Sequence, residues 1–222
     1  MATAWTIFLK DLRLELRTRE SLSAMVIFAA AVTLLFAFAV NAAPARFQAF
    51  IPGLMWMTYF FTAVLGLLRS FGREKELDAY SLLLSAPVSR GAIYLGKAAA
   101  FFLFLLATQM ISLPLFGLFL NMPLLAAPAS LALIIVLTDL AIAAVGTLIA
   151  GMNLRSPAGE TLLPVLLFPL LAPLLIAATR ATSAALAGRP LREWDLWLML
   201  MVTFFILFAL AGTLIFDHIS EQ

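Results

Sequence analysis

The sequence has no cysteine and only one histidine, His218, among its 222 residues. Without cysteine the chain can form neither a disulfide nor a thiolate metal site. A single histidine also excludes a haem or metal site built from several histidines of this chain. Charge is scarce too, because charged residues make up 12% of the chain and the formal net charge is only +2. This balance gives no basis for nucleic-acid binding.

Motifs for catalysis are also missing. The sequence has no glycine-rich phosphate loop, no zinc motif, and no serine or cysteine nucleophile beside a histidine. His218 follows the last apolar run, where an interfacial histidine is expected more often than a haem or metal ligand. We therefore expect no catalytic residue, no metal site and no cofactor bound by this chain.

What the chain has in abundance is apolar sequence. Hydrophobic residues make up 64% of it and the mean hydropathy is +1.07. A soluble domain of this length could not bury so much apolar surface, so lipid must be the main solvent. We expect one all-α integral membrane domain with six transmembrane helices, at about 21–40, 50–68, 92–120, 129–150, 161–178 and 196–216.

Residues 2–20 predict an amphipathic helix that lies on the membrane surface. Apolar residues recur there at helical spacing and basic residues lie mostly off that line, as suits the headgroup region. The predicted anchors are Trp5, Phe8, Leu12, Arg13 and Arg17. A solvated lead-in to the first span is the alternative. This charged stretch is also unlike the apolar core of a signal peptide.

A charged segment, residues 69–91, separates the second and third spans. Together with Lys97 it holds five basic and three acidic residues, which we expect to sit in water. Leu77, Tyr80 and Leu84 line one side of a predicted helix, so this segment is expected to dock on a soluble partner; a solvated surface helix is the alternative. The residues expected to take part are Arg73, Glu74, Glu76, Leu77, Tyr80, Leu84 and Arg90.

The distribution of lysine and arginine predicts the orientation. Four lie in the N-terminal segment, five in the region 69–97 and one in the loop before the fifth span, which makes ten on one side. The other side has four, one after the first span and three before the sixth. The positive-inside rule therefore places both termini and the charged segment in the cytoplasm.

Asp139 is an ionisable residue near the middle of the fourth span. An ionised carboxylate there costs roughly 2.5–3.5 kcal/mol on insertion scales, so it should face the bundle or a partner. It could line a polar pathway or bond to another subunit. Alternatively it is a protonated or hydrogen-bonded structural residue, with Thr138 or Gln109 as its partner. Both interpretations stay open.

Prolines mark the fifth span as irregular. Pro164, Pro169 and Pro173 each remove a backbone hydrogen bond, so they are expected to bend or break this helix, with neighbouring protein or water supplying partners. The polar segment 179–195 follows, and it is expected to be interfacial with Trp194 and Trp197 at headgroup depth.

An amphipathic N-terminal helix, six spans and a charged helix between spans two and three resemble the membrane subunit of an ABC-2 type exporter. Within that group the sequence is similar to the haem exporter protein B family, the permease of the cytochrome c maturation system. The likeness covers nearly the whole chain. The stretches that carry it are FIPGLMW at 50–56, RSFGRE at 69–74, LLLSAPVSR at 82–90, LGK at 95–97, GETLLP at 159–164 and LFPLLAPL at 167–174.

The resemblance implies a permease subunit of the bacterial inner membrane that is not itself an enzyme. It implies an ABC ATPase subunit that holds ATP and Mg²⁺, a haem-handling membrane subunit, a small membrane subunit and a periplasmic haem chaperone. Haem would be cargo of the complex, and ATP hydrolysis would drive its delivery to the chaperone or release of the loaded chaperone. Three alternatives remain: a permease for a lipid, glycan or drug, an ion-coupled transporter centred on Asp139, and a non-transporting scaffold.

Overall fold

The computed structural model describes residues 2–41, 48–76, 89–153 and 159–218. The chain in these ranges is almost entirely helical, which confirms the predicted all-α class. Its long helices are α1 (Ala2–Thr18), α2 (Glu20–Asn41), α4 (Ile51–Glu76), α6 (Arg90–Leu120), α7 (Pro128–Asn153), α8 (Gly159–Leu186) and α9 (Asp195–His218). Short 3₁₀ turns lie between them: η1 (Gln48–Phe50), η2 (Leu124–Ala126) and η3 (Leu191–Glu193).

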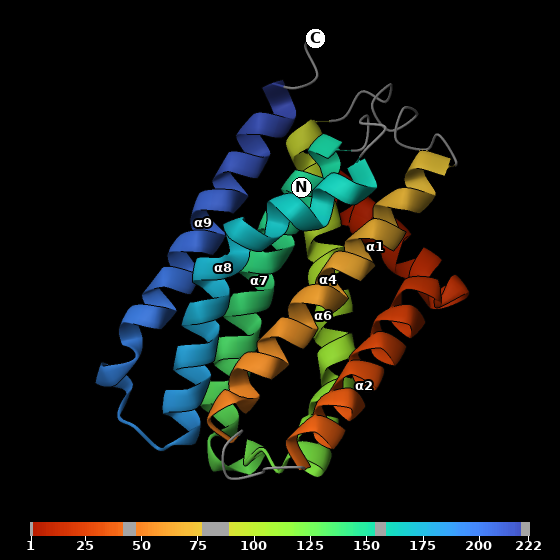
Figure 1. The fold of residues 1–222 in the computed structure, drawn as a ribbon. Helices are drawn as coiled ribbons and strands as arrows, with labels where there is room; N and C mark the ends of the chain where they lie inside the picture. Colours follow the sequence, from red (N-terminus) through yellow and green to blue (C-terminus); the bar gives the residue numbers. More distant parts are fainter. Residues whose placement is uncertain (1, 42–47, 77–88, 154–158, 219–222) are drawn as a thin grey trace.

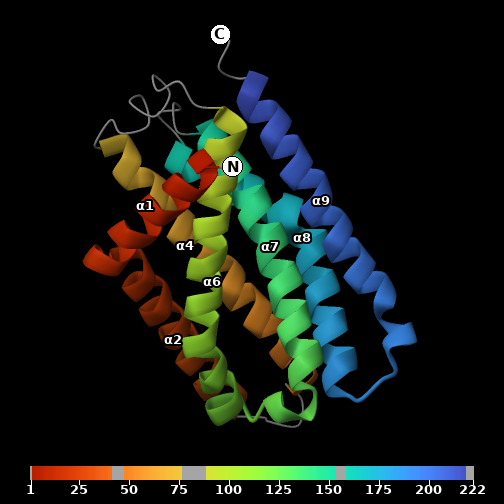
Figure 2. The same ribbon diagram turned by 180° about the vertical axis from the view of Figure 1, so that it is seen from behind.

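Six of these helices, α2, α4, α6, α7, α8 and α9, are long and apolar enough to cross a membrane. They run side by side, and α1 lies across one end of the bundle (Figures 1 and 2). The helix α7 is at the centre, since it packs against α4, α6, α8 and α9. The helix α9 lies at the edge, and few of its described side chains are buried. The protein is therefore a multi-pass membrane protein.

The start of α1 and the end of α9 lie at the same end of the bundle, as an even number of spans requires (Figure 1). The last turns of α4 and the first turns of α6 lie at this end too (Figure 2). We call it the charged end, because it carries α1 and the helical part of the charged segment. The opposite end carries η2, η3 and the start of α9, and we call it the outer end after the predicted orientation.

Two helices continue beyond the ends predicted for their membrane spans. The helix α4 does not stop near residue 68 but continues to Glu76, so the second span and the start of the charged segment form one helix. The helix α8 ends at Leu186 and not near 178. The residues beyond 178 include several alanines, the best helix former, and they extend the helix although the segment is more polar.

The prolines of α8 bend the helix without breaking it. Pro164, Pro169 and Pro173 all lie inside one continuous helix, so the prediction that they are helix-breaking is wrong. The first turns of α8 run at a clear angle to the rest, which agrees with the alternative of a bent span (Figure 1). Each proline removes one hydrogen bond of the helix, and the remaining bonds hold the chain in helical form across the bend.

Hydrogen bonds join neighbouring spans inside the bundle. The Trp56 indole N–H donates to the Thr182 hydroxyl at 2.9 Å, which ties α4 to α8. The Tyr94 hydroxyl of α6 lies 3.0 Å from the carbonyl oxygens of Ala144 in α7 and Phe208 in α9. Such bonds hold helix pairs in lipid, where apolar contact alone gives no preference for protein over acyl chains.

Candidate functional site

The predicted docking residues fall at the charged end. Arg73, Glu74 and Glu76 belong to the final turns of α4, and Arg90 is the first residue of α6. The structure therefore brings these two groups to the same end of the bundle (Figure 1). Leu77, Tyr80 and Leu84 lie outside the described residues, so the apolar face of the docking helix stays a prediction.

The helix α1 packs along the first half of α6 at this end. Its Trp5 is 61% exposed and stacks on Phe8, with ring centroids 5.0 Å apart. Phe8 and Leu12 are partly buried against the core, whereas Arg13 and Arg17 are exposed. This division of apolar and basic side chains is the one that a surface helix at a membrane needs.

Lys97 corrects the expectation that the basic residues after the second span all sit in water. It is only 3% exposed, and its Nζ lies 3.5 Å from Asp11 Oδ2 and 5.0 Å from the centre of the Phe71 ring. The carboxylate and the ring compensate the loss of hydration of the ammonium group. Asp11 also lies 3.0 Å from Lys10 Nζ. Sequence reasoning missed this pair, although Asp11 follows buried Ile7 by four residues and so shares its face.

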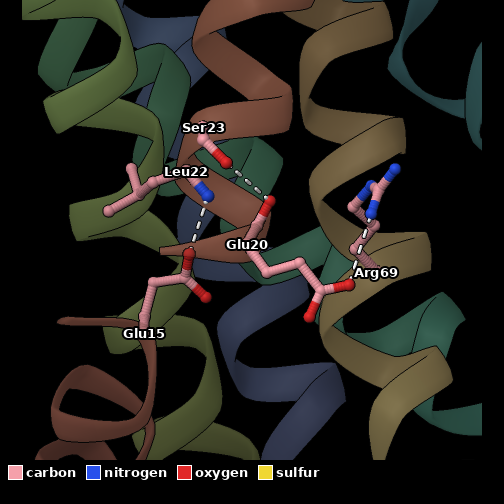
Figure 3. A network of polar contacts seen from close by, with 5 residues as sticks. All are labelled: Glu15, Glu20, Leu22, Ser23 and Arg69. Atoms are coloured by element: carbon pink, nitrogen blue, oxygen red, sulfur yellow. Dashed lines mark hydrogen bonds and ion pairs between the residues drawn. The ribbon is translucent and has the colours of Figure 1, made fainter. Parts of the chain in front are cut away.

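A polar network fixes the corner between α1 and α2 (Figure 3). Arg19 at this corner adopts a left-handed backbone with φ of 54°. The Glu15 side chain is 1% exposed, and its Oε1 accepts the backbone N–H of Leu22 at 2.7 Å. Glu15 thus satisfies one of the free N–H groups in the first turn of α2, as a capping residue does.

The same corner is linked to α4. Arg69 Nη1 lies 3.4 Å from Glu20 Oε1, and the Ser23 hydroxyl donates to the Glu20 carbonyl at 3.2 Å (Figure 3). Arg69 and Glu20 are both exposed, so this ion pair adds little to stability. The ion pair instead helps to fix the position of α2 relative to α4, because it connects the start of α2 to α4 one turn before Arg73. A movement of the end of α4 would therefore also move the junction between α1 and α2.

Asp139 lies in the centre of the bundle and is fully buried. Its Oδ1 accepts a hydrogen bond from Gln109 Nε2 at 2.7 Å, which ties α7 to α6. Gln109 is thus the partner, whereas the Thr138 hydroxyl points to Met201 Sδ at 3.6 Å. The carboxyl joins helices within the bundle, and within the described residues no ion pair reaches it.

Tyr59 of α4 is a member of this buried group that sequence reasoning missed. Its hydroxyl lies near Ser112 and Asp139. Within the described part of the chain, neither this hydroxyl, nor Asp139 Oδ2, nor Gln109 Oε1 makes a hydrogen bond. A tyrosine within a span normally indicates packing, and nothing in the sequence pattern indicates that Tyr59 lies in the same buried group as Asp139.

The family of the chain is decided by comparison over its whole length. A family model described as CcmB protein matches residues 2–217. The chain belongs to the CcmB family. The match includes α1, the charged segment and all six spans, so it covers every feature described above.

Individual members of the CcmB family agree with this assignment. Haem exporter protein B of Pseudomonas aeruginosa is 28% identical over 199 residues, 89% of each chain. The protein of the same name from Paracoccus denitrificans is 30% identical over 183 residues, 82% of this chain and 83% of that one. A third, from Bradyrhizobium diazoefficiens, is 27% identical over 179 residues, 81% and 80% of the two chains. The predicted resemblance to the haem exporter protein B family is confirmed.

Proposed function

We propose that this CcmB family member is the membrane permease subunit of a haem-exporting ABC transporter that serves cytochrome c maturation. The observation that carries the proposal is the family match over residues 2–217, together with relatives that are named haem exporter protein B. Six membrane-crossing helices support a permease. Because the sequence has no phosphate-binding loop, ATP hydrolysis belongs to a separate ABC ATPase subunit.

The charged end is proposed to receive force from that ATPase. The helix α4 runs unbroken from the membrane core to Glu76, and α6 begins at Arg90, so both helices lead directly to the docking segment. Leu77, Tyr80 and Leu84 would supply the apolar anchor. The surrounding charges (Arg73, Glu74, Glu76 and Arg90) would set the register of docking.

This proposal requires the charged end to face the cytoplasm of a bacterium, with the chain in the inner membrane. The excess of lysine and arginine at the charged end supports this orientation. The other proposed members of the complex are a haem-handling membrane subunit, a small membrane subunit and a periplasmic haem chaperone. Haem is proposed as cargo of the complex, with the route of haem assigned to no residue of this chain.

Asp139 is proposed to hold helices together. Its complete burial and its bond to Gln109 support a structural tie between α6 and α7 over a pathway lining. An ion-coupled transporter centred on this carboxyl would instead need no ATPase at all.

The test is a mild-detergent pull-down of the tagged chain from cells that express its neighbouring genes. We expect an ABC ATPase to co-purify, and the combined Leu77→Asp and Leu84→Asp variant to lose it along with the yield of c-type cytochromes. Leu191→Asp is the matched control, since Leu191 is 56% exposed at the outer end and should retain the ATPase.

Three outcomes would contradict parts of the proposal. If the double variant keeps both the ATPase and the cytochrome yield, the docking assignment is wrong. If deletion of the gene leaves the yield of c-type cytochromes unchanged, the cargo assignment is wrong. If transport by the purified chain needs no ATPase, the assignment to an ABC transporter is wrong.

A further inference from the structure

A pocket of ≈ 370 Å³ opens at the outer end, on the side of the bundle formed by α8 and α9. The connection between α8 and α9 that lines it lies at the opposite end of the bundle from the end of α4 and the start of α6 (Figure 1). The residues that matter for its chemistry are Ile176 and Arg180 of α8, Arg189 and Glu193 of the connection, and Trp197 of α9.

The pocket has an excess of positive charge. Arg180 is exposed near the end of α8, and it makes no ion pair or hydrogen bond with any residue that the structure describes. Arg189 is 62% exposed, and its Nη1 lies 3.8 Å from Glu193 Oε2, too far for a hydrogen bond. Two guanidinium groups and one carboxylate leave a net charge of about +1 with free N–H donors.

The membrane side of the same pocket is apolar. Ile176 is 55% exposed and lies one helical turn before Arg180, on the same face of α8. Trp197 is half-buried beside it, and tryptophan is enriched at the level where acyl chains meet headgroups. An apolar floor below a cationic rim fits an amphiphile with an acidic group.

We propose that this pocket binds the phosphate group of an anionic phospholipid. Arg180 and Arg189 pair with the phosphate oxygens, because the planar guanidinium fork matches phosphate geometry. The first acyl carbons lie along Ile176 and Trp197. A headgroup with one net negative charge neutralises the pocket, and the bilayer supplies this ligand at high local concentration. Binding of a phospholipid at this pocket does not depend on which cargo the transporter carries.

The test uses the full chain, in its complex, in nanodiscs of phosphatidylcholine with increasing phosphatidylglycerol, with retained lipids counted by native mass spectrometry. We expect preferential retention of phosphatidylglycerol. Arg180→Gln should reduce its apparent affinity about fivefold, the effect of roughly one basic residue near an anionic lipid. Arg189→Gln should add a similar loss in the double variant.

Arg192→Gln is the matched control, because Arg192 is exposed in η3 at the same end but does not line the pocket. It should leave retention within about twofold of the unmodified chain, since Arg192 supplies no donor to the pocket and salt weakens the effect of an exposed charge outside it. Glu193→Gln tests the sign of the charge argument, and it should strengthen retention of phosphatidylglycerol by raising the net charge of the pocket.

Clear outcomes would overturn the proposal. Equal retention of the two lipids, or an equal loss in Arg192→Gln, would mean that only general surface charge attracts lipid. Weaker retention of phosphatidylglycerol in Glu193→Gln would contradict the charge argument, because this substitution raises the net charge of the pocket. If haem, a dicarboxylate, binds in an Arg180-dependent manner and phosphatidylglycerol does not compete, the pocket serves another acidic amphiphile. All the substituted side chains are exposed, so an unchanged melting temperature verifies folding.

Discussion

At the scale of single residues, the charged end depends on a lysine that is out of water. Lys97 is buried beneath α1, and Asp11 is its carboxylate partner within the described residues. A buried pair gives little net stability over apolar side chains of similar volume, but losing one partner leaves an uncompensated charge. The pair therefore acts mainly to specify where α1 sits on α6.

Asp11→Asn should destabilise the protein by about 3 kcal/mol, because the buried ammonium group of Lys97 loses the negative charge of the Asp11 carboxylate. Intrinsic fluorescence during thermal unfolding measures this, since the chain has four tryptophans. Adding Lys97→Met should restore most of the loss. If the single variant melts like the unmodified chain, the ammonium group has another source of compensation and the pair is not decisive.

A second prediction at the residue scale concerns Asp139. Asp139→Asn keeps an oxygen that can accept the Gln109 N–H bond, so the change in unfolding free energy should stay below about 1 kcal/mol. Asp139→Leu leaves the Gln109 amide buried without a partner and should cost roughly 1–3 kcal/mol. The same thermal unfolding measurement compares the two variants. Equal losses in both would contradict the structural role of this hydrogen bond.

At the scale of elements, the contact of α6 with α9 depends on the absence of a side chain. A Cβ placed on Gly212 would overlap the Tyr94 ring, whose hydroxyl bonds to carbonyl oxygens of α7 and α9. Three spans therefore meet at one tyrosine, and α9, which is otherwise at the edge of the bundle, is held there.

Gly212→Ala should destabilise the protein by about 1–3 kcal/mol, because the Tyr94 ring must leave its position or α9 must move away. Gly72→Ala is the matched control in another helix, since nothing lies within 4 Å of its added Cβ. The control should be neutral or gain up to about 1 kcal/mol from helix propensity. Equal melting temperatures for the two variants would show that α9 does not depend on this contact.

The transmembrane helices are the part of the structure that the sequence predicts best. Six spans follow from hydropathy alone, because the thickness of the bilayer fixes the length of an apolar helix. Hydropathy predicts the ends of the helices less well. Both α4 and α8 continue into polar sequence, because the residues there have a high helix propensity. The prolines predicted where α8 bends but not that it stays one helix, because this depends on the packing around it.

The site was predictable only in part. Gln109 could be named as a partner of Asp139, because both residues lie near the middle of their spans. The Lys97–Asp11 pair and the position of Tyr59 could not be predicted, because they depend on how each helix is rotated and on where α1 crosses the bundle. Single-sequence periodicity reports the faces of a helix, but not which neighbour each face meets.

At the scale of the whole molecule, the two ends of the bundle differ in chemistry. The charged end combines α1, the end of α4 and the start of α6. The Lys97–Asp11 pair joins α6 to α1, and the Glu20–Arg69 contact joins the start of α2 to α4. The outer end is built from short 3₁₀ turns and the α8–α9 connection with its arginine-lined pocket. This polarity is what a permease needs if a cytoplasmic motor drives it from one end only.

The central claim is that an ABC ATPase docks at the charged end, and in-cell photo-crosslinking measures this most directly. A photoreactive amino acid is introduced at Ser89, just before α6, or at Arg192 in η3; both positions are exposed, at opposite ends. The account predicts a crosslink to the ATPase from position 89 and none from position 192. A crosslink from position 192, or none from position 89 in a complex that still supports cytochrome c maturation, would contradict it.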